Sequence, residues 1–370
     1  MAKPIIVHKL RRVLHLGLED DLAPWKMRLI RSLPSGMQNH GPDADDALAS
    51  RLQLYRPSFP SLDGVAGLGR MARMARTMRG YDLVVTWGER AINAVMAHSL
   101  FTQPLSLPPL VNMHDSLEGF SGGRLRDLRH RIAFSRTPII VVPTLTSAQE
   151  FARAWSPAAG SIHAVTPLYP PAPRDSVRPD AIPRLLKRRQ EKWIGTRAAD
   201  IAPFADSLMQ ALRKLDSAWL MVVFGSSAQA APVAEAAQQA GVQDRLLFSD
   251  RMDGPGARIG QTSLAGMFEL AIVRAHGCIP SDLLEAQAAK VPCIAIGGPA
   301  LAQLLPPDTR MVQHVSPDAG AIAEAMVMLC ADEEARRATG KSNGQFAAAH
   351  TSPAEYHQLL AGLLGVPKLT

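Results

Sequence analysis

Short apolar runs alternate with longer mixed segments along the chain, and this alternation is typical of parallel βα units. In the first half, four runs predict strands, over residues 12–18, 81–88, 109–115 and 138–143. Each of the last three runs precedes a segment that predicts a helix, and Thr146 followed by Gln149 offers a capping box for the last of these helices. The first half therefore predicts one sheet domain.

The same alternation resumes beyond a proline-rich stretch, residues 167–179, which cannot continue a helix or a central strand. Strands are then predicted over residues 192–197, 219–225, 245–248, 270–273 and 293–296. We therefore predict an α/β chain of two Rossmann-like domains that face each other across a cleft. The predicted parts are a first domain at 1–170, a linker at 171–185, a second domain at 186–350, and an apolar C-terminal helix in 351–370 that is able to pack back on the first domain.

The composition indicates a soluble globular protein with ample core, since 47% of the 370 residues are hydrophobic and 20% are charged. No apolar stretch reaches the roughly 18 residues of a membrane-spanning helix. The first residues also lack the apolar run of a signal peptide, so we expect a cytoplasmic protein. Three cysteines without a CxxC spacing and eleven dispersed histidines predict neither a disulfide framework nor a metal site.

The net charge of +7 conceals a marked difference between the two halves. Residues 1–190 hold 26 Lys and Arg against 15 Asp and Glu, whereas residues 191–370 hold 14 against 18. One predicted helix carries an arginine at every third position from Arg70 to Arg79, and four more arginines crowd residues 124–131. Such helices bind anionic lipid headgroups, although a solvated helix face has the same pattern. Aromatic residues are only 5% and are not interleaved with basic ones, which argues against nucleic acid.

Residues 281–296 carry the most informative chemistry. Asp282 and Glu285 lie at the start of a predicted helix, which follows a loop and precedes a buried strand. Ligands of parallel α/β sheets bind outside the carboxyl ends of the strands, where the free N–H groups of a helix N-terminus suit a phosphate. The simpler alternative is that a Glu in the first turn only complements the helix dipole.

Several short segments occur in an order that carries a resemblance to a known family. They are residues 14–17, 81–85 and 114–115 in the first half, and residues 222–225, 240–248, 280–286 and 291–292 in the second. In this order they resemble the retaining, nucleotide-sugar-dependent glycosyltransferases of family 4, whose fold is called GT-B. The resemblance covers nearly the whole chain, and the order of elements carries more of it than any single motif. It implies that the first domain lies on the acceptor side and that the second binds the nucleotide sugar.

The resemblance also implies site residues. Glu285 would bind the ribose hydroxyls, and the amides of the helix start would lie near the diphosphate, which Arg197 would neutralise. Gly17 would let the backbone approach the donor phosphate, and His114 would lie near the transferred sugar and the acceptor. The implied catalytic residues are His114 and Glu285, and the implied donor-binding residues are Gly17, Gly195, Arg197, Ser281, Asp282, Leu283, Leu284 and Glu285.

Each of these residues also has a purely structural interpretation. Arg197 could instead form a surface ion pair or cap a helix. His114 could be an interior histidine, and Gly17 could serve a tight turn. The glycines Gly119, Gly122 and Gly123 match no P-loop and predict a flexible loop.

Two positions depart from the family pattern. Gly277 stands where a second acidic residue would contact the sugar, and Ile201 stands where a lysine would neutralise the diphosphate. Four basic residues of a nearby segment are candidates to replace that lysine, namely Lys187, Arg188, Arg189 and Lys192.

The leading hypothesis is a cytoplasmic glycosyltransferase of polysaccharide biosynthesis, with the basic first domain at the inner face of the membrane. It would move a sugar from a nucleoside diphosphate sugar to a hydroxyl of a glycan or lipid-linked acceptor. The resemblance implies that the leaving diphosphate helps to deprotonate the acceptor, so no metal, cofactor or covalent nucleophile is expected. The two departures keep a second hypothesis open, a non-catalytic binding or scaffold protein in polysaccharide assembly. A third is another enzyme of this architecture, such as a nucleotide-sugar epimerase.

Overall fold

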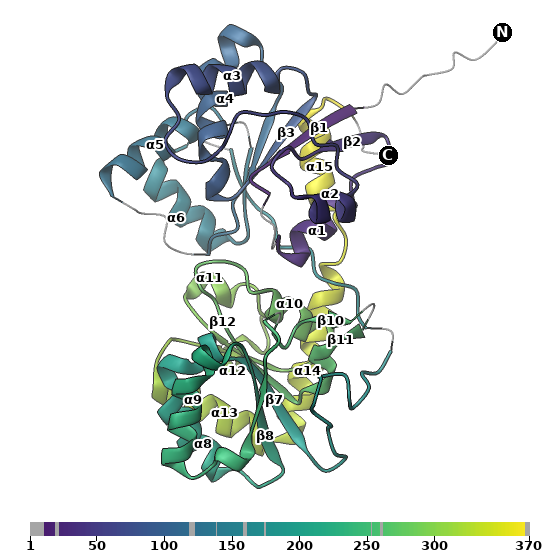
Figure 1. Cartoon of the computed structure of the whole chain (residues 1–370), viewed down its shortest axis with the longest axis vertical. Helices are drawn as coiled ribbons and strands as arrows, with labels where there is room; N and C mark the ends of the chain where they lie inside the picture. The colour runs from purple at the N-terminus through teal and green to yellow at the C-terminus, as the bar shows by residue number, and fades with distance from the viewer. Residues whose placement is uncertain are drawn as a thin grey trace, which may run out of the picture. The chain divides into compact units, whose positions relative to one another are not determined.

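The computed structural model describes residues 11–18, 22–117, 123–137, 139–157, 161–173, 175–252, 254–259 and 262–366. The chain divides into two compact units, unit 1 of Met1–Leu168 with Ser352–Thr370 and unit 2 of Tyr169–Thr351. Each unit has a six-stranded parallel sheet with helices packed against it (Figure 1). The chain is therefore an α/β protein with two Rossmann-like units, as its pattern of apolar runs predicts.

The sheet of unit 1 has the strand order β2-β1-β3-β4-β5-β6, and all neighbouring strands are parallel. Its central strands are buried on both faces, which is why they are continuous apolar runs in the sequence. The strands are β1 (Arg11–Leu16), β2 (Met37–His40), β3 (Leu83–Trp87), β4 (Leu110–Met113), β5 (Ile139–Val142) and β6 (Ile162–Ala164).

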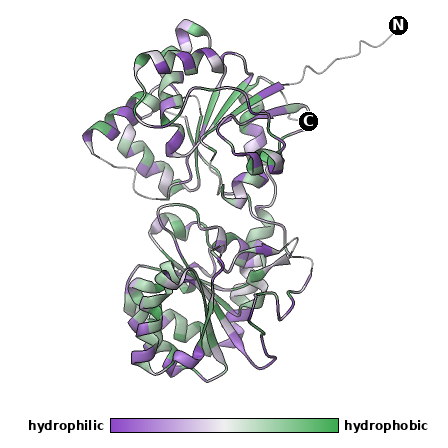
Figure 2. Ribbon diagram, viewed as in Figure 1, coloured by the Kyte–Doolittle hydropathy of each residue, from purple (hydrophilic) through white to green (hydrophobic). Residues whose placement is uncertain are grey.

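One helix of unit 1, α4, is buried over its first half and packs against both α3 and α5. The helix α3 turns its methionines toward the core and its arginines outward, and Figure 2 shows the resulting alternation of apolar and polar colour. The helices are α1 (Pro24–Arg31), α2 (Asp46–Leu52), α3 (Leu68–Met78), the 3₁₀ turn η1 (Glu89–Ala91), α4 (Ile92–Leu105), α5 (Arg124–Phe134), α6 (Leu145–Trp155) and α15 (Ala354–Leu363).

The sheet of unit 2 has the order β14-β13-β12-β7-β8-β9 and is also parallel throughout. A separate antiparallel pair, β10 with β11, lies outside that sheet. The strands are β7 (Lys192–Arg197), β8 (Trp219–Phe224), β9 (Leu246–Ser249), β10 (Arg258–Ile259), β11 (Thr262–Ser263), β12 (Leu270–Arg274), β13 (Cys293–Ile296) and β14 (His314–Val315).

The helices of unit 2 surround its sheet, and several of them contribute to a hydrophobic core separate from that of unit 1. They are α7 (Ala198–Ile201), η2 (Ala202–Phe204), α8 (Ala205–Lys214), α9 (Ser227–Ala240), η3 (Gln243–Arg245), η4 (Leu264–Met267), α10 (Ser281–Ala288), α11 (Pro299–Ala302), α12 (Arg310–Gln313), α13 (Ala319–Ala331) and α14 (Glu333–Ala349).

The predicted apolar runs correspond to β1, β3, β4 and β5 in unit 1 and to β7, β8, β9, β12 and β13 in unit 2. The prediction missed β2, β6, β10, β11 and β14, which are short and partly polar, so they lack the apolar signal of the central strands. The predicted capping box was wrong, because the Thr144 side chain accepts from the Ser147 N–H at 3.0 Å. The helix α6 therefore begins at Leu145 rather than after Thr146.

Candidate functional site

The predicted donor-site residues of unit 2 lie where β7 ends and α10 begins. Arg197 is the last residue of β7, and its Nε donates to Asp282 Oδ2 at 2.5 Å. Its Nη1 donates to the Met252 carbonyl at 2.9 Å. The other Asp282 oxygen, Oδ1, accepts from the Gly256 N–H at 2.9 Å. A buried carboxylate in the first turn of α10 therefore holds both the arginine and the loop that follows β9.

Two glycines allow that loop to approach the ion pair. A Cβ on Gly254, whose φ is +73°, would lie 2.6 Å from the Arg197 guanidinium. A Cβ on Gly256 would lie 2.5 Å from Asp282 Oδ1. The run of Gly254, Pro255 and Gly256 was the signal in the sequence for this close approach, and no prediction was drawn from it.

Glu285 lies one helical turn after Asp282, so the two carboxylates project from the same face of α10. Its side chain is 3% exposed and pairs with Arg258, whose Nε lies 2.7 Å from Glu285 Oε2. Arg258 also donates from Nη2 to the Pro171 carbonyl at 3.1 Å. The predicted ribose ligand is thus held by Arg258, a cation that is not among the predicted site residues.

A third buried carboxylate, Asp200 in α7, lies at the same edge of the sheet. It accepts from the Arg274 N–H at 3.1 Å and lies 2.8 Å from His276 Nε2. Burial raises the pKa of Asp282, the Arg197 guanidinium opposes the rise, and the Asp200 charge adds to it. The edge therefore combines carboxylates, which bind hydroxyls, with guanidinium groups, which bind phosphate oxygens.

The other predicted donor residues contribute to packing. Gly195, in the middle of β7, lies under Phe268, whose ring atoms would be 2.8 Å from a Cβ at that position. Leu283 and Leu284 are fully buried, and the Leu283 N–H donates to the Pro280 carbonyl at 3.1 Å. Ser281 is the partly buried first residue of α10. Donor binding by these four residues stays a prediction.

The two positions that depart from the family pattern differ in their surroundings. Ile201 is fully buried in the hydrophobic core of unit 2. Gly277 has a φ of +76°, and no atom lies within 4 Å of the place its Cβ would take. Three of the candidate replacement cations have partners of their own: Lys187 with Glu269 at 2.8 Å, Arg188 with Glu191 at 3.8 Å and Lys192 with Asp216 at 4.0 Å.

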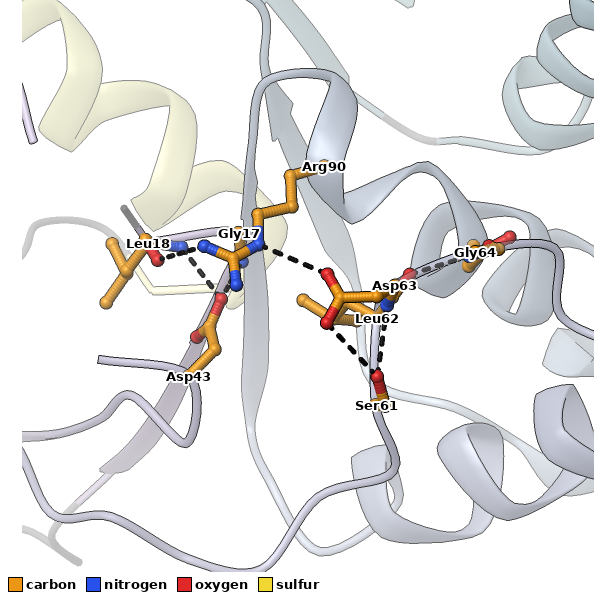
Figure 3. Close-up of polar contacts among 9 residues, drawn as sticks. Gly17, Leu18, Asp43, Ser61, Leu62, Asp63, Gly64 and Arg90 are labelled. Atoms are coloured by element: carbon orange, nitrogen blue, oxygen red, sulfur yellow. Dashed lines mark hydrogen bonds and ion pairs between the residues drawn. The ribbon is translucent and has the colours of Figure 1, made fainter. Parts of the chain in front are cut away.

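In unit 1, Gly17 follows β1 with a φ of +84°, a conformation that favours glycine. A Cβ there would lie 2.5 Å from the Trp87 carbonyl oxygen. The N–H groups of Gly17 and Leu18 both donate to Asp43 Oδ2, at 2.6 and 2.9 Å, and Arg90 Nη1 donates to the Leu18 carbonyl at 3.3 Å (Figure 3). A carboxylate of the chain itself therefore meets the backbone donors that we predicted to approach a phosphate.

Asp43 is the central group of this arrangement. Burial raises its pKa, and the N–H groups of Gly17 and Leu18, with the Arg90 charge, oppose the rise. Arg90 Nε also lies 3.7 Å from Asp63 Oδ1, as Figure 3 shows. Gly17 thus has a structural reason to be glycine, and its role in donor binding stays a prediction.

His114 directly follows β4 and is 8% exposed. Its ring stacks on Trp155 with 5.8 Å between centroids and meets the edge of Phe151 at 5.4 Å. Burial lowers the pKa of His114 to about 4, although Asp115 and Glu89 act in the opposite direction. The ring is therefore neutral at physiological pH, and in that form it is able to hydrogen-bond a hydroxyl.

Within the described residues, no three histidine, cysteine, aspartate or glutamate side chains are grouped so that they could hold a metal ion. In the same part of the chain, the helices are all too short or too polar to cross a membrane. Cys278 is exposed, Cys293 and Cys330 are buried, and none of these three described cysteines forms a disulfide. Gly119 and Gly122 of the predicted loop lie outside the described residues, and Gly123 precedes α5.

Comparison with known proteins identifies the fold. No family model matches the chain, and no curated protein matches it by sequence. Among the solved structures that match, HepE from Anabaena in complex with UDP and glucose is 13% identical over 96% of this chain and 99% of that one, with a TM-score of 0.69. Sucrose-phosphate synthase from Thermosynechococcus elongatus is 16% identical over 95% of this chain and 100% of that one, with a TM-score of 0.65. The chain has the GT-B fold.

The GT-B fold by itself leaves the reaction open. A UDP-N-acetylglucosamine 2-epimerase also matches this GT-B chain, with 11% identity over 98% of this chain and 100% of that one and a TM-score of 0.59. The function must therefore be argued from the site residues and not from the fold.

Proposed function

We propose that this GT-B chain is a retaining glycosyltransferase that moves a sugar from a nucleoside diphosphate sugar to a hydroxyl of a glycan or lipid-linked acceptor. The observation that carries the proposal is the pairing of Asp282 with Arg197 and of Glu285 with Arg258 on one face of α10. A nucleoside diphosphate presents ribose hydroxyls to carboxylates and phosphate oxygens to guanidinium groups. The UDP and glucose of the HepE complex belong to the same chemical class.

In this proposal each group has a defined role. Arg197, whose side chain is 35% exposed, binds a phosphate oxygen alongside Asp282. Glu285 accepts hydrogen bonds from the ribose hydroxyls, and Arg258 fixes the orientation of its carboxylate. His114, neutral through burial, hydrogen-bonds the transferred sugar or the acceptor. The leaving diphosphate takes the acceptor proton, so the proposal requires no metal and no cofactor.

Ile201 favours a second candidate function, binding without turnover in polysaccharide assembly. Because its side chain lies in the core of unit 2, this position cannot supply a cation to the sheet edge. Gly277 likewise supplies no carboxylate. The donor site then has one cation and one carboxylate fewer than the donor site of the family that the chain resembles. The loss of these two charged groups would weaken catalysis more than nucleotide binding. An epimerase, the third candidate, would isomerise the donor without an acceptor.

The proposal predicts that a nucleotide protects the purified chain against thermal unfolding. At about 100 times its Kd, a ligand that binds only the folded state stabilises it by roughly 2.7 kcal/mol. We therefore expect UDP, GDP or ADP, alone or as its sugar, to raise the Tm by several degrees. The measurement is thermal unfolding with each compound at millimolar concentration, and inorganic pyrophosphate is the control for a non-selective anion effect.

The outcomes of this measurement separate the candidates. A base-selective shift supports the donor site and names the nucleotide. Release of nucleotide that depends on an acceptor then identifies a transferase, isomerised donor identifies an epimerase, and neither product identifies the binding protein. No shift with any nucleotide contradicts the proposed donor site.

We also propose that unit 1 binds an anionic membrane surface. The helix α3 buries Met71, Met74 and Met78 in the core, and its arginines lie on the remaining face. In α5, Leu125 and Leu128 are 79% and 55% exposed, and Arg124 and Arg131 lie on the same exposed face. Exposed leucines flanked by arginines are typical of helices that lie in a membrane interface.

Vesicle binding tests this surface. We expect the chain to sediment with vesicles that contain phosphatidylglycerol and not with pure phosphatidylcholine, because each basic residue near an anionic surface contributes about 1 kcal/mol. The double variant Leu125→Ser, Leu128→Ser should bind at least tenfold more weakly. Met311→Ser, at a 91% exposed position of unit 2, is the matched control and should bind as the unchanged chain does. Equal binding by the double variant would contradict the assignment of α5.

A further inference from the structure

Glu89 and His130 form an ion pair that none of the roles above uses. Glu89 opens η1 with one residue between it and the end of β3, and His130 lies in α5. His130 Nε2 lies 2.7 Å from Glu89 Oε2, and His130 Nδ1 lies 2.7 Å from the Arg126 carbonyl oxygen. A carboxylate and a carbonyl both only accept, so both ring nitrogens must donate. The imidazolium form of His130 satisfies this geometry.

The two partners differ sharply in exposure. The His130 side chain is 1% exposed, whereas the Glu89 side chain is 46% exposed. Trp155 stacks on the histidine ring with 4.3 Å between centroids and 19° between planes. Burial of a cation costs free energy. Here the Glu89 carboxylate, the Arg126 carbonyl and the face of the Trp155 ring offset that cost. The pair therefore joins a buried ring to a half-exposed carboxylate.

The second carboxylate oxygen of the half-exposed Glu89 side chain is Oε1. Arg126 Nε lies 3.5 Å from it, which is longer than a good hydrogen bond. Burial by itself would raise the pKa of Glu89, but the hydrogen bond and charge of His130, with the charge of Arg126, hold it below its ordinary value. Oε1 is therefore an ionised acceptor beside a guanidinium donor whose side chain is 40% exposed.

We propose that Glu89 and Arg126 bind a hydroxyl group of the carbohydrate acceptor, with His130 as the residue that positions Glu89. A hydroxyl donates to Oε1 and accepts from the guanidinium, so it satisfies both groups. A cation would be repelled by His130 and Arg126, whereas a neutral hydroxyl is repelled by none of the three groups. The inference rests on the proposed function, since it names a part of the site that takes the acceptor.

The place of the pair in the fold agrees with this assignment. Glu89 follows the carboxyl end of β3, and His114 follows the end of the neighbouring strand β4. Ligands of parallel sheets bind at this edge. Both histidine rings also stack on Trp155, so His114 and the Glu89 pair share one aromatic support.

The first test is the kinetics of Glu89→Gln. The amide oxygen can still accept from His130, so the variant keeps the support of the ring while it removes the charge. With the donor that turns over best among UDP-glucose, UDP-galactose, GDP-mannose and ADP-glucose, and with p-nitrophenyl glycosides as acceptors, we expect the acceptor KM to rise at least tenfold. The Kd of the nucleotide should stay within twofold. Glu150→Gln, in α6 of the same unit, is the control and should leave both constants unchanged.

The second test does not depend on turnover. Titration of the labelled chain with methyl glycosides and sucrose, followed by the NMR signal of the His130 Nε2–H, should give a saturable shift that Glu89→Gln abolishes. If no nucleotide binds and no nucleotide sugar turns over, the proposed function is wrong. This titration still tests whether Glu89 and Arg126 bind a sugar hydroxyl. An unmoved His130 signal with all these sugars, or an unchanged acceptor KM in Glu89→Gln, would overturn the inference.

Discussion

Replacement of Glu285 by alanine should lower the free energy of unfolding of unit 2 by about 3 kcal/mol. The variant removes the carboxylate that pairs with Arg258 at 2.7 Å and leaves that guanidinium, 22% exposed, without the partner. Nucleotide affinity should fall by roughly 10- to 100-fold, because hydrogen bonds from the ribose to a charged group are lost. Urea unfolding measures the first effect, and calorimetric titration with the nucleotide that raises the Tm measures the second.

Arg258→Met is the matched variant, because it breaks the same pair and keeps the carboxylate. Its stability loss should equal or exceed that of Glu285→Ala, since Glu285 is 3% exposed and its charge would be left uncompensated. Its nucleotide affinity should fall less. If Glu285→Ala loses stability but binds the nucleotide within twofold of the unchanged chain, Glu285 is structural and its assignment to the ribose is wrong.

The partners of Glu285 and Asp282 show where reasoning from the sequence ends. Their common face on a helix can be predicted, because a spacing of three residues is nearly one helical turn. Their cations could not be predicted, because Arg197 reaches Asp282 across 85 positions of sequence. That contact depends on β12, which precedes α10, lying beside β7 in the sheet. The order of strands in a sheet is a tertiary property that apolar periodicity does not contain.

Unit 1 shows the same limit at Gly17. Its need for glycine could be predicted from the tight turn after an apolar run, but the physical cause is the Trp87 carbonyl on the neighbouring strand β3. Asp43 was missed because it follows β2, whose sequence Met-Gln-Asn-His has no alternation of apolar and polar residues. The central strands were predictable because burial on both faces demands apolar residues. The edge strands β2, β6 and β14 were not, whereas the edge strand β9 was predicted from its apolar run.

Acidification from pH 7 to 4.5 should destabilise unit 1 through two buried histidines. Burial lowers the pKa of both His15 and His114 from 6.5 to about 4. Between these values the unfolded chain binds protons that the folded chain does not, so the free energy of unfolding falls as the pH falls. At about 1.4 kcal/mol per pH unit, each histidine should account for roughly 2 to 3 kcal/mol. Urea unfolding of the full chain at several pH values, with limited proteolysis to assign each transition to a unit, measures this loss.

His15→Gln isolates one of the two contributions. Trp87 Nε1 donates to His15 Nδ1 at 3.3 Å, and His15 Nε2 lies 3.0 Å from Asn39 Oδ1, which accepts its proton. The neutral ring satisfies both contacts, whereas a proton on Nδ1 would face the Trp87 N–H. Glutamine supplies one donor and one acceptor without titrating in this range, so the loss of unfolding free energy of unit 1 between pH 7 and 4.5 should become smaller by roughly 2 kcal/mol. If the pH dependence of the unfolding free energy of unit 1 is unchanged in His15→Gln and absent in His114→Gln, the acid sensitivity of unit 1 is due to His114 alone.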